Sequence, residues 1–122
     1  MEYYRKLVWM KAVNQRNQAV LADKVKIAST FIKRLIGLLD RAYLNEGEGL
    51  IISPSNSIHM FFMRFAIDVL FLDKNGKVVA ILRSFKPWKL SRIYFNAYSV
   101  IELPTGAIDK TGTQEGDFIK IS

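Results

Sequence analysis

The chain of 122 residues contains no cysteine and only one histidine, His59. The lack of cysteine excludes a disulfide, a thiolate nucleophile and a cysteine-ligated metal. A single histidine also excludes metal sites built from several imidazoles, so we expect neither a metal nor a cofactor. The glycine-rich phosphate and dinucleotide loops and the Gly-x-Ser-x-Gly elbow of hydrolases are missing too. These absences exclude several common types of catalytic site.

Long hydrophobic runs are also missing. The apolar run Leu7–Met10 is far too short for the hydrophobic region of a signal peptide, and no run approaches the length of a membrane span. We therefore expect a cytoplasmic protein without a membrane span. Half of the residues are nevertheless hydrophobic, and a chain of this length buries enough surface to fold without a disulfide or a metal. We expect one domain over residues 1–122.

Positive charge is concentrated in the N-terminal third of the chain. The net charge is +7, and residues 1–35 carry eight lysines or arginines against two acids, whereas residues 36–122 are nearly neutral. Such a basic segment is compatible with nucleic acid or another anionic surface. No lysine- or arginine-rich block, RNA-binding signature or zinc finger accompanies it. We therefore interpret the charge as a solvated face, and non-specific nucleic-acid binding is the less favoured function.

Short apolar segments separated by glycine, proline and asparagine turns dominate the chain. Strands are expected over residues 4–13, 19–28, 50–52, 69–73, 77–85, 98–103 and 118–121. Apolar side chains at helical spacing predict one amphipathic helix over residues 31–39, and a short helical turn is expected over 107–111. This pattern is typical of a mainly β protein, a compact barrel or sandwich with one amphipathic helix.

The stretch Ile58–Val79 contains the clearest hairpin signal. Asp73, Lys74, Asn75 and Gly76 follow one another between two apolar runs, which predicts a tight turn with Gly76 at positive φ. We interpret this hairpin as the central one of the sheet. If residues 58–63 are extended, alternate side chains of that run share a face.

Isolated polar and aromatic residues around this stretch form the candidate site. Arg64 and Asp68 lie in an apolar run, and we expect them to form an ion pair because an unpaired buried charge is very costly. As a binding group, Arg64 would instead hold a carboxylate or phosphate. His59 is either hydrogen-bonded at a sheet edge or a base beside a carboxylate. Trp88, in a basic loop, either packs on the body or stacks on a sugar or base.

Two functions of different classes follow from these residues. The preferred one is a non-enzymatic binding or interaction module that holds a small anion or carbohydrate near His59, Arg64, Asp68 and Trp88. The alternative is a hydrolase that uses Asp68 with His59 or Glu102. Catalysis requires these groups to lie within hydrogen-bond reach of each other, directly or through one water.

Several ordered motifs resemble a known family. They are Gly49-Leu50-Ile51-Ile52, the run from Ser57 to Asp73, the Lys86-Pro87-Trp88-Lys89 loop, the run from Ala97 to Gly106 and the pair Gly116-Asp117. Upstream, Arg34-Leu35-Ile36-Gly37-Leu38 fits the same pattern. Over about residues 19–122 the chain is similar to domain-of-unknown-function family 192. The resemblance implies a compact mainly β domain and no established reaction. Many relatives have a cysteine near Ser55, a glycine near Phe62 and a proline near Ala66, and this chain departs from them at all three positions.

Overall fold

The structure is a computed structural model that describes residues 10–28 and 43–122. In this part of the chain, seven strands form one curled sheet, a half-barrel, and one short helix lies near the C-terminus. The elements are β1 (Met10–Asn14), β2 (Val20–Ala28), β3 (Glu48–Ile52), β4 (Ile67–Leu72), β5 (Val78–Phe85), β6 (Ser99–Pro104), α3 (Ala107–Thr111) and β7 (Ile119–Ile121). The predicted mainly β architecture and the C-terminal helical turn are confirmed. The amphipathic helix predicted over 31–39 lies outside the described residues.

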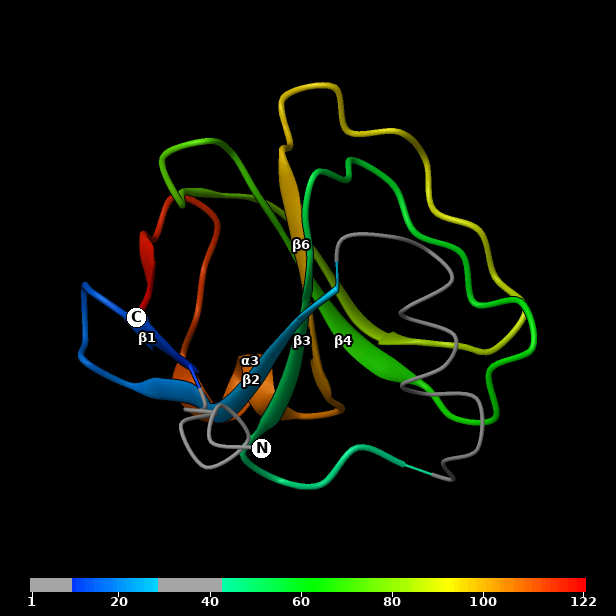
Figure 1. Cartoon of the computed structure of the whole chain (residues 1–122), viewed down its shortest axis with the longest axis horizontal. Helices are drawn as coiled ribbons and strands as arrows, with labels where there is room; N and C mark the ends of the chain where they lie inside the picture. Colours follow the sequence, from blue (N-terminus) through cyan, green and yellow to red (C-terminus); the bar gives the residue numbers. More distant parts are fainter. Residues whose placement is uncertain (1–9, 29–42) are drawn as a thin grey trace, which may run out of the picture.

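The strand order is β5-β4-β6-β3-β2-β1-β7, in which only β2 and β3 run parallel to each other. Strand β6 pairs with both β4 and β3, so the β4–β5 hairpin lies at one end of the sheet. The interpretation of this hairpin as the central one is therefore wrong. Lys77 and Phe118 form an isolated antiparallel bridge between the two ends of the sheet, which explains its curled shape (Figure 1).

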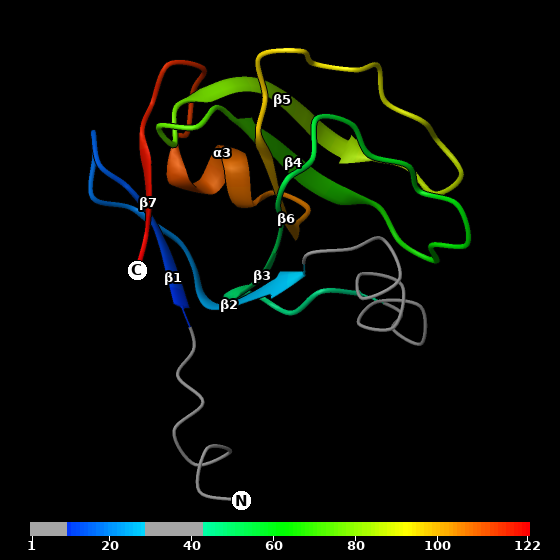
Figure 2. The same ribbon diagram turned by 45° about the horizontal axis from the view of Figure 1, so that its top comes forward.

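Strand β4 is buried on both of its faces. Ile67, Val69 and Phe71 pack into one core cluster. Leu70 and Leu72 pack into a second cluster, in the concavity of the curled sheet, where α3 lies (Figure 2). Because side chains alternate along a strand, Asp68 lies on the concave side, together with Leu70. The position of α3 therefore determines what this carboxylate can contact.

The other face of the sheet is covered by two long loops, residues 53–66 and 86–98, which we call the double loop. Backbone hydrogen bonds join its two halves: Met60 N–H donates to the carbonyl of Lys89 at 2.8 Å, and Trp88 N–H donates to the carbonyl of Met60 at 2.7 Å. The loops run side by side in both ribbon views (Figures 1 and 2). Their inward side chains belong to the core, and these are Ile58, Met60 and Met63. The double loop is thus a second layer on the sheet.

The turn between β4 and β5 requires a glycine at position 76. Gly76 has a φ of 84°, as predicted, and a Cβ added there would lie 2.7 Å from the carbonyl oxygen of Ile119. We expect Gly76→Ala to lower the free energy of unfolding by about 2–3 kcal/mol, because the left-handed conformation and the backbone clash both oppose the methyl group. Urea denaturation followed by circular dichroism measures this loss.

Gly106 provides the matched control for that variant. Its φ is 91°, but a Cβ added there would meet nothing within 4 Å. Gly106→Ala therefore reports the conformational cost alone, which is about 1 kcal/mol. Equal losses in the two variants would contradict the predicted clash with Ile119.

Candidate functional site

Asp68 is buried, and backbone amides from two other elements bind its carboxylate. Oδ1 accepts a hydrogen bond from Ser84 N–H at 2.9 Å. Oδ2 accepts two more, from Gly106 N–H at 3.1 Å and from Ile108 N–H at 3.0 Å. The side chain is only 1 % exposed. Asp68 therefore connects β4 to β5 and to the first turn of α3, which is a structural role.

The expected ion pair between Arg64 and Asp68 does not form. Asp68 faces the concave side of the sheet, where the three amides occupy both of its oxygens. Arg64 lies on the double loop, is exposed and forms no ion pair within residues 10–28 and 43–122. The expectation was wrong because the partner of the buried carboxylate is backbone rather than a cation.

The register of β4 and β6 separates Asp68 from Glu102. Asp68 pairs with Leu103, and Val69 pairs with Glu102. Residues directly opposite each other share a face, so Asp68 and Glu102 face opposite sides of the sheet. His59 lies on the double loop, which covers the face opposite to Asp68. The two pairs required by the hydrolase alternative are therefore not assembled around Asp68.

The structure does bring His59 and Trp88 together, along with three residues that the sequence did not single out. The rings of His59 and Phe61 stack with centroids 4.8 Å apart, and Phe62 meets Trp88 edge-on at 5.1 Å. Phe61 lies 6.3 Å from Trp88, and Leu90 faces His59 across an isolated antiparallel bridge. We call these five residues the aromatic tip. The aromatic run around Phe61 and Phe62 could have indicated this cluster from the sequence. Such a run, however, is also typical of a strand in the core.

Two rings of the aromatic tip are exposed and held in an unfavourable backbone conformation. Phe62 and Trp88 are each 60 % exposed, and their φ angles are 68° and 67°. The left-handed conformation costs a non-glycine residue roughly 1–2 kcal/mol. Burial of these half-exposed rings offsets little of that cost. Glycine is the residue that fits this φ without strain.

The double loop carries charge of one sign only. Residues 53–66 and 86–98 contain no aspartate or glutamate. Their cations are all exposed, and these are Arg64, Lys86, Lys89 and Arg92. Seven of the eleven large hydrophobic side chains that are exposed in the described chain also lie here, namely Phe61, Phe62, Trp88, Leu90, Ile93, Phe95 and Tyr98. The double loop therefore combines exposed rings, aliphatic groups and positive charge.

A groove of about 700 Å³ opens elsewhere, between the start of β2 and the turn that leads into α3. Gly106 lines this groove, and its N–H donates a hydrogen bond to the buried carboxylate of Asp68. Asp68 therefore fixes the backbone position of one residue in the lining of the groove. Glu46 and Lys110, which also line it, form an exposed ion pair that lowers the pKa of Glu46. None of the four candidate residues lines the groove.

Outside the double loop, described acidic side chains form ion pairs with single cations, such as Arg16–Asp117 and Arg83–Asp109. Across residues 10–28 and 43–122, no group of three or more histidine, cysteine, aspartate or glutamate side chains is placed to hold a metal ion. No helix in the same residues is long and apolar enough to cross a membrane.

The curled seven-stranded sheet with its single described helix defines a class of small mainly β proteins. Within that class, the chain belongs to the DUF192 family, described as an uncharacterised ACR family, whose model matches residues 10–121. It is 38 % identical over 111 residues to a UPF0127 protein of Thermococcus sibiricus, an alignment that covers 88 % of this chain and 71 % of the relative. A UPF0127 protein of Pyrococcus horikoshii is 37 % identical over 111 residues, with coverage of 88 % and 96 %.

Two solved structures share the fold. A protein of unknown function from Novosphingobium aromaticivorans superimposes with a TM-score of 0.75 at 20 % identity, covering 91 % of this chain and 82 % of that one. A putative transcription regulator from Sinorhizobium meliloti gives a TM-score of 0.73 at 19 % identity, covering 94 % and 96 %. The family has no characterised function, and identities this low establish the fold alone.

Proposed function

We propose that this protein is a non-enzymatic interaction module that binds an anionic ligand through the aromatic tip and the cations around it. The observation that carries the proposal is the pair Phe62 and Trp88, two exposed rings packed together in left-handed backbone conformation. Strained residues concentrate at functional sites, where surrounding structure maintains them. These two rings lie on a surface whose formal charges are all positive.

Each part of this surface suits a part of an anionic ligand. The exposed face of Trp88 offers a platform for a sugar ring or another flat apolar group. Arg64, with its planar fork, and Lys86 and Lys89, as point charges, suit phosphate, sulfate or carboxylate groups. Asp68 has no place in this proposal, because three backbone amides already bind its carboxylate.

Fluorescence of Trp88 tests the proposal directly. The chain contains two tryptophans, so Trp9→Phe leaves Trp88 as the only one. Dextran sulfate is the anionic probe, and uncharged dextran of the same length is its control. We expect dextran sulfate to protect Trp88 from acrylamide quenching and uncharged dextran to leave it unprotected. Lys86→Gln with Lys89→Gln should weaken binding about tenfold, since both lysines flank the ring.

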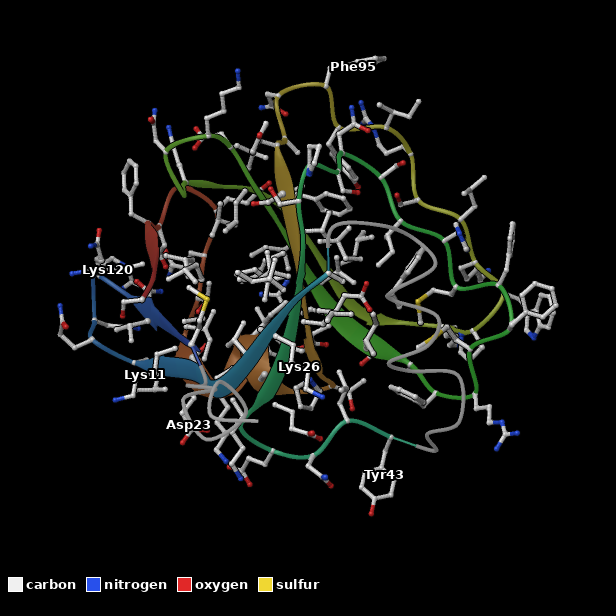
Figure 3. The ribbon with its side chains drawn as sticks, in the orientation of Figure 1. Lys11, Asp23, Lys26, Tyr43, Phe95 and Lys120 are labelled. Atoms are coloured by element: carbon white, nitrogen blue, oxygen red, sulfur yellow. The ribbon has the colours of Figure 1, made fainter. Side chains whose placement is uncertain are left out.

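Lys11→Gln with Lys120→Gln gives a charge-matched control. These two lysines are exposed on β1 and β7, on the side of the molecule away from the double loop (Figure 3). Both double variants have the same net charge, so general attraction to a polyanion falls equally in the two. We expect the β1 and β7 variant to weaken binding less than about threefold. Equal weakening in both variants, or binding that leaves the quenching of Trp88 unchanged, would contradict the proposal.

A further inference from the structure

The double loop uses different side chains for its own packing and for its outward surface. The inward side chains are at most 4 % exposed, and these are Ile58, Met60 and Met63. The outward apolar side chains of the aromatic tip are 38–67 % exposed, and these are Phe61, Phe62, Trp88 and Leu90. The inward side chains attach the loops to the core, so the packing of the loops does not depend on the outward side chains. Removing an outward ring should therefore leave the fold in place.

The outward side chains are exposed and do not line the groove described above. That groove of about 700 Å³ is formed by other segments, and no residue of the double loop lines it. Phe95, further along the double loop, is 86 % exposed and points away from the body of the protein (Figure 3). Small ligands are usually held in concave sites, whereas exposed aromatic and aliphatic side chains outside such a site suit an extended, deformable surface.

From this combination we infer that the anionic partner of the aromatic tip is the surface of a membrane rich in anionic lipids, an inference that rests on the proposed function. Tryptophan and phenylalanine side chains settle at the level of the lipid head groups. The exposed cations Lys86, Lys89 and Arg92 are attracted to anionic head groups, and the net charge of +7 draws the whole chain to such a surface.

The aliphatic residues favour lipid over single-stranded nucleic acid. Leu90 is 67 % exposed and Ile93 is 48 % exposed. Nucleic acids bind to exposed rings by stacking of their bases, and an aliphatic side chain has no π-face for a base. Leucine and isoleucine instead gain free energy from transfer out of water into the acyl boundary of a bilayer. A membrane as the partner explains why exposed aliphatic side chains occur beside the exposed rings and the cations.

Vesicle binding by the Trp9→Phe protein tests this inference. The probes are vesicles of phosphatidylcholine alone and vesicles that also contain phosphatidylglycerol. We expect co-sedimentation and a blue shift of Trp88 emission only with phosphatidylglycerol, quenching by brominated acyl chains, and a loss of binding as salt is added. Lys86→Gln with Lys89→Gln should weaken binding about 10–30-fold, and Lys11→Gln with Lys120→Gln less than about threefold.

Phe62→Gly tests the ring without disturbing the backbone, because glycine adopts the φ of 68° at this position freely. We expect this variant to keep its thermal unfolding midpoint and to weaken vesicle binding about tenfold. If the wild-type thermal midpoint is preserved and vesicle affinity is unchanged, the inference is wrong.

The outcomes separate the inference from the proposed function. Equal binding to both kinds of vesicle, or none to either, overturns the membrane inference. If Trp88 is still protected by dextran sulfate in that case, the proposed function stands and only the membrane is excluded. If single-stranded RNA but no vesicle binds through Lys86, Lys89 and Phe62, nucleic acid replaces lipid as the partner. If dextran sulfate, vesicles and RNA all leave Trp88 unaffected, both the inference and the proposed function fail.

Discussion

Asp68→Asn is expected to lower the free energy of unfolding by about 3–4 kcal/mol. The carboxylate accepts three hydrogen bonds from buried or partly buried backbone N–H groups of Ser84, Gly106 and Ile108. An asparagine offers one oxygen and directs an NH₂ group at the remaining donors, so buried N–H groups lose their acceptor. Hydrogen bonds to a charged group are worth about 1.5–3 kcal/mol each, and an unsatisfied buried donor adds its desolvation cost. Urea denaturation measures the loss.

Arg64→Gln is the control for this variant. Arg64 is exposed and has no ion-pair partner in the described residues, so its removal should change the free energy of unfolding by less than about 0.5 kcal/mol. A comparable loss in both variants would mean that the two residues act as a pair after all. A loss confined to Asp68 supports its role as the connector between β4, β5 and α3.

A second large effect is expected at Asp117, which joins the last turn to the first hairpin. Its carboxylate accepts hydrogen bonds from Arg16 Nε at 2.7 Å, from Asn14 Nδ2 at 2.8 Å and from Gln114 N–H at 2.9 Å. The Arg16 guanidinium, assisted by Asn14 and Gln114, lowers the pKa of Asp117 from 3.8 to about 2, against the opposing effect of burial. We expect Asp117→Asn to cost about 2 kcal/mol at neutral pH.

The pH dependence of that cost follows from the direction of the shift. Because the pKa of Asp117 is lower in the folded protein than in the unfolded chain, its stabilising contribution is complete above about pH 4 and is lost as the pH falls to about 2. The difference in unfolding free energy between the wild type and Asp117→Asn should therefore shrink over that interval. Urea denaturation across the acid range checks this, and a difference that stays constant down to pH 2 would contradict it.

Asp109→Asn is the matched control for Asp117. Asp109 also pairs with an arginine, Arg83, at 2.8 Å, but its side chain is 71 % exposed. Exposed ion pairs are worth at most about 1 kcal/mol, so this variant should lose little at any pH. The comparison separates burial of the carboxylate from the mere presence of an arginine partner.

Local chemistry made several elements of the fold predictable. The Asp73–Gly76 turn, the β2 strand and the helical turn after Gly106 were all expected from short runs of residues, and all are present. Such elements depend on φ preferences and on the period of apolar side chains, which neighbouring residues determine. The order of strands does not depend on neighbours, and the insertion of β6 between β4 and β3 was accordingly missed.

The candidate site was only partly predictable, and its residues explain why. Trp88 was expected in a basic loop and lies in one. His59 and Arg64 were assigned to the same apolar stretch as Asp68, and the sequence did not indicate that their segment forms a loop that pairs with the Trp88 loop. Met60 and Lys89 are joined by a backbone hydrogen bond across about thirty positions of the chain. The sequence did not indicate that the ring of Phe62 is exposed and lies beside Trp88.

By itself, the sequence determined that this protein is mainly β, that it contains no cysteine chemistry, and that a glycine must stand at the β4–β5 turn. Only the tertiary structure decided the partner of Asp68 and the surface formed by Phe62 and Trp88. The amides that bind Asp68 lie 16, 38 and 40 positions away. Local patterns specify the backbone conformation and period of a segment, whereas the partner of a buried charge is specified by whichever distant segment the folded sheet places beside it.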